Sequence, residues 1–548
     1  MSNDSDCSVQ TLGGGTCPSR EFGRRDLAYV CALALSIWLV NAIWLALDTR
    51  PPVWDMAMHQ AYAFNYLADG SPGGARGPQI WTRSGNYPPL VHLLIAFCYL
   101  LFHPGPHIAL LANVPATFIL LWAAYELALH HAGRAAARWA CLLTALIPYL
   151  FWTSRETIVD YWLSALVAAG LVVLHKTGGF QKRTASLVLG LLLALGMLTK
   201  WLYGGFLFFP IIYIIVRHRV WKYPTRLINL IDALLIAGLL SGIWYLPNLL
   251  RLVGYFSANA QIGALEGEPA VLSFQSLIYY LRLLEGYQLF AILFAFVSIA
   301  CVVVWRRHLL HDGRFLLVAV AGGWTVMTLL RTKDPRFTMP LLALLTIPAG
   351  AWIQSWGRSW ISTGVKILLV TVLAAQAYMI NFGISWLPQS IVLAEGYQGS
   401  LRWDWNLYLQ HYFHVFGAPR REDWKQAVIL RAMAQDANRR GLGLSLALIP
   451  DLPRFSAANF HLYARLLGIR ARNIDHLSDA GKGIHSFNGF DYVLMTEGDQ
   501  GMPWTTGAGR ALNQIVMDEH GIFQLVDLFP LPNGDSVRLY AIVRAGGQ

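Results

Sequence analysis

Charged residues are scarce in this chain of 548 residues: Asp, Glu, Lys and Arg make up 13% of it, against roughly 25% in ordinary globular domains. Hydrophobic residues reach 55% and the mean hydropathy is +0.44, so long segments are expected to lie in lipid. The composition excludes a disordered chain, a collagen and an ordinary soluble enzyme. The net charge of +11 does not require nucleic acid, because membrane proteins collect Lys and Arg in cytoplasmic loops.

Cysteine and nucleotide-binding motifs are also lacking. The six cysteines lie in the N-terminal tail or in apolar segments, so neither a disulfide framework nor a zinc site is predicted. There is no Walker A motif, no Gly-x-Gly-x-x-Gly after a strand, and no Asp-x-Asp outside the tail, which argues against nucleotide-sugar binding. The 16 histidines are scattered without metal-ligand spacing. No cofactor is therefore predicted, and a metal requirement stays open.

About eleven apolar runs predict transmembrane helices. Residues 1–24 form a polar tail, and the first run, about Leu27 to Leu47, is too long for a signal-peptide core and is expected to stay as a membrane helix. The further runs lie near 108–130, 136–152, 158–175, 185–199, 201–216, 227–247, 287–305, 315–330, 337–354 and 363–386. Basic connectors between many of them predict that those loops, like the tail, face the cytoplasm.

One further run, Pro88 to Phe102, would place the later basic loops on the exported side if it crossed the membrane. Its length of about 15 residues permits a re-entrant or interfacial segment on the exported side. The exported side then carries five short stretches, and the unusual charges of the membrane half all lie in them. These stretches are Thr49 to Pro89, Thr153 to Asp160, the neighbourhood of Lys200, Pro247 to Tyr287, and Arg331 to Phe337.

After about residue 387 the pattern becomes that of a soluble domain. It predicts strands at Leu444 to Ile449 and Asp491 to Met495, a helix at Ser456 to Leu467, and a hairpin of Phe523 to Phe529 with Ser536 to Val543. We expect an α-helical polytopic membrane domain over 25–387, with about 11 or more transmembrane helices plus re-entrant or juxtamembrane helices. A small α/β domain over 388–548 follows on the periplasmic or extracellular face of a bacterial inner membrane.

Two carboxylates lie where hydrocarbon makes charge costly. Asp55 follows the first helix in Val53-Trp54-Asp55-Met56, and Asp160 follows Ser154-Arg155. A charge at a helix centre costs at least ~2.5 to 3.5 kcal/mol, so such residues are usually paired or functional. The alternative is that each carboxylate caps a helix at the water boundary. The residues alone leave both readings open.

Cations lie on the same predicted face. Lys200 separates two apolar runs almost without a loop, and Arg331, Lys333 and Arg336 crowd one short stretch. Because the positive-inside bias disfavours such residues on the exported side, their presence suggests a bound anion such as the phosphate of a lipid carrier. The alternative is snorkelling to lipid headgroups, which is the reading favoured for Lys333.

Over about residues 25 to 390 the chain resembles the GT-C membrane glycosyltransferases. The nearest branch contains the protein O-mannosyltransferases and the aminoarabinose transferase of lipid A, glycosyltransferase families 39 and 83. The resemblance rests on motifs in order: Asp55, Asn86-Tyr87-Pro88-Pro89-Leu90, Ser154-Arg155 with Asp160, Leu198-Thr199-Lys200-Trp201, and Asp334-Pro335-Arg336-Phe337-Thr338-Met339-Pro340. One departure is Met56, where the mannosyltransferases usually carry Glu.

The resemblance implies a polyprenyl-phosphate sugar donor, a lipid, glycan or protein acceptor, and an inverting displacement at the outer membrane boundary. It implies that Asp55 is the catalytic aspartate and Asp160 the second acidic residue. Lys200 and Arg336, with Arg331 beside them, are expected to bind the donor phosphate. Elementary chemistry agrees, because a base must take the proton of the acceptor hydroxyl and cations stabilise a phosphate that leaves as an anion.

Three further residues are expected near the substrate: His59, Tyr87 and Arg155. His59 lies one turn from Asp55 and is otherwise an interfacial histidine. Arg155 either pairs with a carboxylate of the cleft or meets headgroups. The competing function is a transporter or flippase of a lipid-linked sugar, and the third is a structural subunit of an envelope complex. The lack of inverted repeats and the gathering of charge on one face favour the enzyme.

Overall fold

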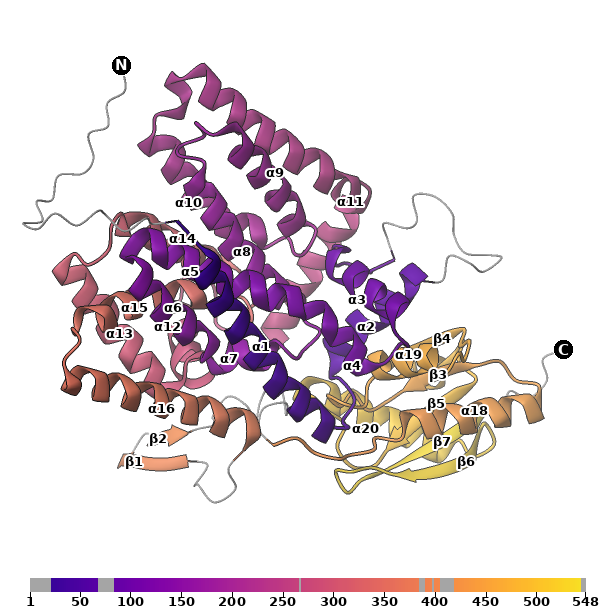
Figure 1. Ribbon diagram of the computed structural model, residues 1–548. Helices are drawn as coiled ribbons and strands as arrows, with labels where there is room; N and C mark the ends of the chain where they lie inside the picture. The colour runs from indigo at the N-terminus through magenta and orange to yellow at the C-terminus, as the bar shows by residue number, and fades with distance from the viewer. Residues whose placement is uncertain are drawn as a thin grey trace, which may run out of the picture.

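The computed structural model describes residues 21–67, 83–265, 268–383, 390–396, 399–404 and 418–543 (Figure 1). Within these ranges the helical part comprises α1 (Arg24–Leu47), α2 (Trp54–Leu67), α3 (Leu90–Leu101), α4 (Pro106–Ala109), η3 (Leu110–Asn113), α5 (Val114–Ala132), α6 (Arg134–Ala145), α7 (Pro148–Thr153), α8 (Val159–Lys176), α9 (Arg183–Met197), α10 (Tyr203–Arg217), η4 (Val220–Lys222), α11 (Pro224–Leu265), α12 (Phe274–Leu283), the π-helix η5 (Leu284–Gln288), α13 (Phe290–Arg307), α14 (Gly313–Leu329), η6 (Met339–Leu341), α15 (Leu342–Ser355) and α16 (Trp360–Phe382).

Among the described residues, six helices are long and apolar enough to cross a membrane. They are α1, α8, α13, α16, the α4–α5 unit and most of α11, and shorter apolar helices stand beside them. The predicted polytopic α-helical class is confirmed, and each predicted run falls on one or more helices, while the number of crossings stays a prediction. The 12-residue helix α3 is about 18 Å long, shorter than the ~30 Å hydrocarbon core. Such a length suits the interfacial segment predicted at Pro88 to Phe102.

Two predicted boundaries are wrong, and proline is involved in both. The sequence predicts that one apolar run ends at Pro247, but α11 continues through this proline to Leu265. The run 136–152 is expected to form one helix, but α6 ends at Ala145 and α7 starts at Pro148. A proline in the first helical turn loses no helical hydrogen bond, so Pro148 starts a helix at no cost.

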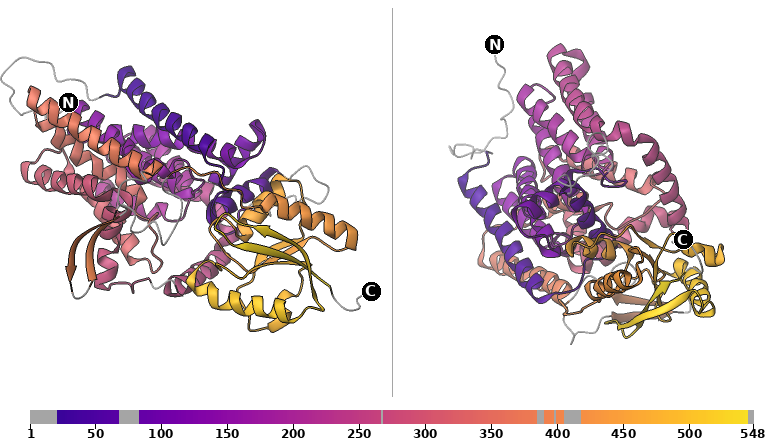
Figure 2. Two further views of the ribbon diagram at one scale, coloured as in Figure 1. Left: turned by 90° about the horizontal axis from the view of Figure 1, so that it is seen from below. Right: turned by 90° about the vertical axis from the view of Figure 1, so that its right-hand side faces the viewer.

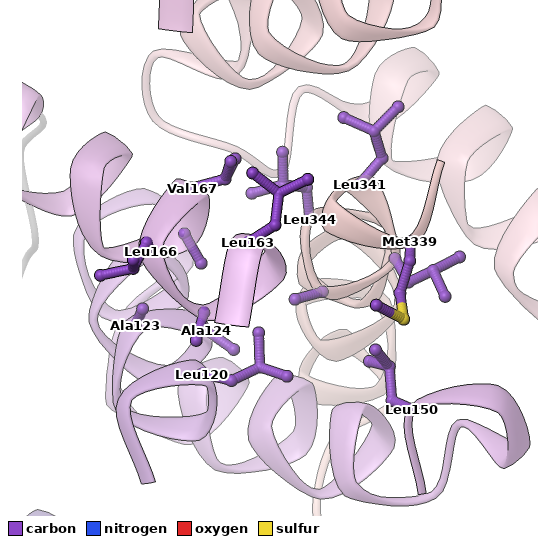
Figure 3. Close-up of a cluster of buried hydrophobic side chains, with 14 of the residues drawn as sticks. Leu120, Ala123, Ala124, Leu150, Leu163, Leu166, Val167, Met339, Leu341 and Leu344 are labelled. Atoms are coloured by element: carbon purple, nitrogen blue, oxygen red, sulfur yellow. The ribbon is translucent and has the colours of Figure 1, made fainter. Parts of the chain in front are cut away.

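Helix α8 lies inside the helical part, and its residues from Val159 to Leu174 are buried. Figure 3 shows buried apolar side chains that meet there. The contributing residues are Leu120, Ala123 and Ala124 of α5, Leu150 of α7, Leu163, Leu166 and Val167 of α8, and Met339, Leu341 and Leu344 of η6 and α15. This core holds the first turn of α8, which carries Asp160, beside the segment that precedes η6, which carries Arg336.

The C-terminal part is an α/β domain that follows a hairpin of β1 (Ser390–Gly396) and β2 (Gly399–Asp404). Its elements are α18 (Gln426–Arg440), β3 (Ser445–Leu448), α19 (Ala457–Leu466), β4 (Asn473–His476), η7 (Gly483–Phe487), β5 (Tyr492–Thr496), α20 (Pro503–Asp518), β6 (Phe523–Pro530) and β7 (Ser536–Ile542). The five-stranded sheet has the order β4-β3-β5-β7-β6, with β3 parallel to β4 and β5 and with β7 antiparallel to β5 and β6. The predicted strands, helix and hairpin are confirmed.

The strand alternation explains the layers of this domain. Leu446 and Leu448 pack with α18 and α19, whereas Ala447 between them packs with α20. The domain lies at one end of the helical part, next to α2 (Figures 1 and 2). The boundary expected between residues 387 and 388 falls beside residues outside the described ranges and stays a prediction, as does most of the tail over 1–24.

Candidate active site

Asp55 lies in the first turn of α2 and forms an ion pair with Arg336. Oδ2 of Asp55 lies 2.7 Å from Nη1 of Arg336. The guanidinium also donates to both oxygens of Asp334, from Nε at 2.9 Å and from Nη2 at 2.6 Å. Burial alone lowers the pKa of Arg336, but the carboxylates of Asp334 and Asp55 raise it well above its ordinary value, so the guanidinium stays charged. The side chain of Asp55 is 37% exposed and is therefore open to a substrate.

A local turn aims Arg336 at Asp55. Asp334-Pro335 begins the turn, the N–H of Phe337 donates to the carbonyl of Asp334 at 3.0 Å, and the N–H of Arg336 donates to Oδ1 of Asp334 at 2.7 Å. Asp followed by Pro is a usual start for such turns, because the carboxylate accepts an N–H two residues on. Gln288, the last residue of η5, donates its amide to the carbonyl of Pro335 at 2.5 Å.

Asp160 and Lys200 form a second ion pair, which is buried. Nζ of Lys200 lies 2.7 Å from Oδ1 of Asp160, and the side chain of Asp160 is only 1% exposed. No side chain caps the start of α8, so the reading of Asp160 as a helix cap is wrong. Lys200 also lies over the ring of Phe337, with Nζ 5.0 Å from the ring centre. Because Phe337 follows Arg336, the two ion pairs are neighbours.

The charges of this site nearly cancel. Asp55, Asp334 and Asp160 contribute three carboxylates, and Lys200 and Arg336 contribute two cations. Lys200 is buried and Arg336 is largely covered, so the interpretation that these two side chains reach out to lipid headgroups is wrong. Their predicted role as phosphate ligands stays a prediction, and a phosphate that binds here has to compete with the carboxylates for the cations.

His59 and Tyr87 lie next to the ion pairs. Nδ1 of His59 is 2.9 Å from Nε2 of His92, and the rings of His59 and Tyr87 meet edge to face with centroids 4.7 Å apart. Both histidines are buried, so the reading of His59 as an interfacial residue is wrong. Burial lowers the pKa of His59 to about 3, and the charges of Arg336 and Lys200 add to the effect. The imidazole is therefore neutral at physiological pH.

An aromatic wall continues from Tyr87. We use this name for Tyr87, Trp201, Tyr255 and Phe256, in which Trp201 lies 5.6, 5.5 and 5.3 Å, centre to centre, from the other three rings in that order. Tyr255 and Phe256 lie on α11. Arg251, on the same helix, donates hydrogen bonds to the carbonyl of Gly85 and to Asn248. Sequence reasoning missed the part of this wall that lies beyond Pro247, because it ended the helix there.

Two predicted site residues do not join the cluster. Arg331 is exposed and is part of neither ion pair. Arg155 is buried, donates from Nη2 to Oδ1 of Asn381 at 2.8 Å, and lies 4.3 Å from the ring centre of Trp44. It thus neither meets headgroups nor forms an ion pair with Asp55 or Asp160, and both readings of this residue are corrected.

Lys333 is a further correction, because it does not meet headgroups. It is buried, and its Nζ donates to the carbonyls of Thr328 and Leu330, each at 2.5 Å. These carbonyls lie at the C-terminal end of α14, where backbone acceptors have no helical partner and a cation is favourable. Lys333 therefore caps α14.

No metal centre is found in the part of the chain that the structure describes. No three side chains of His, Cys, Asp or Glu lie together there in a way that would hold an ion. The residues that sequence reasoning left without a role are Asp334, Gln288, His92 and Arg251. The Asp-Pro turn was a usable signal for Asp334, whereas the other three reach the site from distant segments and leave no local pattern.

Comparison with known proteins identifies the fold. Residues 86–245 match the model of the family described as dolichyl-phosphate-mannose-protein mannosyltransferase, and no curated protein matches the sequence. The structure resembles that of ArnT from Cupriavidus metallidurans in the apo state, at 15% identity and a TM-score of 0.57, over 95% of this chain and 99% of that one. The structure of the same enzyme bound to undecaprenyl phosphate is similar at 14% identity and a TM-score of 0.56, over 95% of this chain and 99% of that one.

A third similar structure is the oligosaccharyltransferase of Archaeoglobus fulgidus in complex with Zn and sulfate, at 11% identity and a TM-score of 0.50, over 94% of this chain and 73% of that one. The chain therefore has the GT-C fold of membrane glycosyltransferases and is a multi-pass membrane protein. The predicted resemblance is confirmed at this level. The segment that matches the family model includes Asp160 and Lys200 but neither Asp55 nor Arg336.

Proposed function

We propose that the chain is an inverting glycosyltransferase that moves a sugar from a polyprenyl phosphate to an acceptor hydroxyl on the exported face of the membrane. The observation that carries the proposal is the presence of two neighbouring ion pairs. In the first, Asp55 binds Arg336 and remains exposed, and in the second, Asp160 binds Lys200 and is buried. The GT-C fold and the likeness to ArnT, a protein whose structure holds undecaprenyl phosphate, support a donor of this chemical class.

Binding of the donor would free the base. The phosphate is an anion and competes with Asp55 for Arg336, whose five N–H donors allow it to hold Asp334 along one edge and a phosphate along another. Asp55 then loses its partner and is free to accept a hydrogen bond from the acceptor hydroxyl. The substrate-free ion pair thus keeps the base occupied until the donor arrives.

The chemical step needs one base and a stabilised leaving group. The acceptor oxygen attacks the anomeric carbon, Asp55 takes its proton, and the bond between that carbon and the phosphate oxygen breaks. The polyprenyl phosphate leaves as an anion, so Lys200 and Arg336 stabilise charge that develops in the transition state, and no general acid is needed. Asp160 is buried on Lys200 and is unsuited to act as the nucleophile that a retaining mechanism requires.

The neighbours of Asp55 suit a sugar. The aromatic wall offers ring faces to the apolar side of a sugar or to the prenyl chain, and buried, neutral His59 packs edge to face on Tyr87 of this wall. The mannosyltransferases usually carry Glu where this chain has Met56, so the acceptor or a second acidic role is expected to differ from theirs.

The test is the chemistry of the cell envelope in a strain that lacks the chain. Glycolipids and glycoproteins are compared by mass with those of strains complemented by the wild type, by Asp55→Asn, or by Arg439→Gln, an exposed change on α18. We expect one glycosyl mass to be lost in the deletion strain and with Asp55→Asn, and to be regained with the wild type and the control. Full recovery with Asp55→Asn would remove the catalytic role of this residue.

A further inference from the structure

The segment Asp48–Trp54, which runs from the end of α1 to the first residue of α2, is held by the C-terminal domain. The N–H of Thr49 donates to the carbonyl of Arg420 at 3.0 Å, and the N–H of Trp54 donates to the carbonyl of Pro453 at 3.0 Å. The indole N–H of Trp54 also donates to Oδ1 of Asp451 at 3.0 Å. Backbone groups at both ends of the segment are therefore bonded to a domain more than 350 residues away in the sequence.

The middle of the segment is Pro51-Pro52, and its carbonyls are bonded as well. Nη1 of Arg454 donates to the carbonyl of Pro51, and Nδ2 of Asn459 donates to the carbonyl of Pro52 at 2.6 Å. Prolines have no N–H, so these carbonyls are the backbone groups through which another element can hold this pair. Arg454 and Asn459 are buried, which makes the two hydrogen bonds costly to lose.

Helix α2 itself packs on the same domain (Figure 1). Ala57 and Ala61, on the helix that begins with Trp54 and Asp55, form a buried cluster with Leu462 of α19. Further along, Nη2 of Arg465 donates to Oδ1 of Asn65 at 3.3 Å. The small alanine side chains bring the two helices close together, so a movement of α19 is passed to α2.

We propose that the C-terminal domain positions the base of the reaction, with Arg454 and Asn459 as positioning residues that act through Pro51 and Pro52. This inference rests on the proposed function. The two side chains fix the backbone just before Asp55, and so fix the direction in which α2 begins and the place of the carboxylate against Arg336. A displacement of about 1 Å in such a group costs up to about a hundredfold in rate.

Asn459→Asp is the variant that best separates the contact with Pro52 from the cap of α19. Oδ1 of Asn459 accepts the N–H and the hydroxyl of Ser456 at the start of α19, at 3.1 and 2.9 Å, while Nδ2 is the donor to Pro52. Aspartate keeps the acceptor that caps α19 but replaces the donor with an oxygen that repels the Pro52 carbonyl. Ser456→Ala is the matched control, because it weakens the same cap and leaves the bond to Pro52 in place.

The full-length variants are purified in detergent, and two quantities are measured for each. The first is the maximal rate at which undecaprenyl phosphate is released when polyprenyl-phosphate sugars extracted from the host membrane react with an envelope extract as acceptor. The second is the affinity for added undecaprenyl phosphate, measured by titration. The same titration gives the number of binding-competent sites. For Asn459→Asp and Arg454→Gln we expect a rate per site lowered about ten- to a hundredfold and an affinity within about twofold of the wild type. Arg454→Lys keeps a donor and should recover part of the rate.

Ser456→Ala should melt at a lower temperature than the wild type and keep its rate per site. If Asn459→Asp and Arg454→Gln kept the wild-type rate per site while Asp55→Asn abolished transfer, the positioning inference would be overturned and the proposed function would stand. If Asp55→Asn also kept the wild-type rate, the role of Asp55 as base would fall and the positioning role with it. Equal losses of rate in Ser456→Ala and Asn459→Asp would reduce the contact to a contribution to folding.

Discussion

Asp55 and Asp160 carry the same carboxylate in different surroundings. Asp55 is 37% exposed and shares Arg336 with Asp334, whereas Asp160 is 1% exposed and bonds to Lys200. An acceptor hydroxyl has to approach the base, so only the exposed carboxylate suits proton transfer. The buried one is suited to hold Lys200 in place, a role that the resemblance of the sequence to GT-C enzymes does not assign to it.

The buried pair gives a prediction at this scale. Asp160→Asn leaves the ammonium of Lys200 buried without its carboxylate, which should cost about 3 to 5 kcal/mol of stability. The double variant Asp160→Asn with Lys200→Met removes the stranded charge and should regain much of this loss. If Lys200 binds the donor phosphate, the double variant should still bind undecaprenyl phosphate about ten- to a hundredfold more weakly than the wild type.

Thermal melting and lipid-phosphate titration in detergent separate the two effects. A double variant that regains both stability and affinity would show that Lys200 serves the fold alone.

At the scale of elements, the end of α14 depends on Lys333. Its ammonium holds two carbonyls that have no helical partner, and hydrogen bonds to a charged group contribute about 1.5 to 3 kcal/mol. Lys333→Met should therefore lower the melting temperature while the affinity for undecaprenyl phosphate stays near that of the wild type. An affinity loss as large as that expected for the double variant Asp160→Asn with Lys200→Met would place Lys333 among the phosphate ligands instead.

The elements also show what the sequence can predict. Apolar length and strand alternation are local properties, so the helical runs, the strand at Leu444 to Ile449 and the C-terminal hairpin are confirmed. The partners of buried charges need not be local. The sequence favours headgroup contact for Lys333 and leaves Arg155 open between headgroups and a carboxylate. In the structure Arg155 bonds to Asn381 on α16, and Lys333 bonds to the end of α14. The contact of Arg155 depends on packing between distant segments, which no single-sequence pattern records. Lys333 bonds to carbonyls only three and five residues before it, so its role as a cap follows from where α14 ends.

The whole molecule contains a titrating group at the junction of its two parts. Burial raises the pKa of Glu156 to about 7 from an ordinary 4.5, although the cations of Arg454 and Arg155 lower it. Asp48 and Arg50 are the other charged groups that act on this carboxyl. Between pH 4.5 and about 7 the folded state keeps a proton that the unfolded chain has lost, so stability should fall as the pH rises through this window.

Glu156→Gln has no proton to lose there. Its melting temperature should vary less with pH across the same window than that of the wild type. Parallel curves for the two proteins would mean that another group sets the dependence.

Topology is the second prediction at this scale. The basic connectors predict that the α8–α9 loop is cytoplasmic and that the C-terminal domain is exported. In a chain without native cysteines, Gln181→Cys should resist an impermeant maleimide in intact cells, and His520→Cys should react, since both positions are exposed in the structure. Labelling of Gln181→Cys from outside would overturn the predicted orientation.

The central claim is that Asp55 drives cleavage of a polyprenyl-phosphate sugar, and the most direct measurement is product release by purified protein in proteoliposomes. Wild-type chain given polyprenyl-phosphate sugars and an envelope extract as acceptor should release undecaprenyl phosphate and form a glycosylated product of inverted configuration. Asp55→Asn keeps the size of the side chain but removes its basicity, so release should fall by about 10² to 10⁴ while undecaprenyl phosphate still binds. Movement of intact donor across the bilayer without cleavage, equal in the wild type and Asp55→Asn, would contradict the account and identify a transporter.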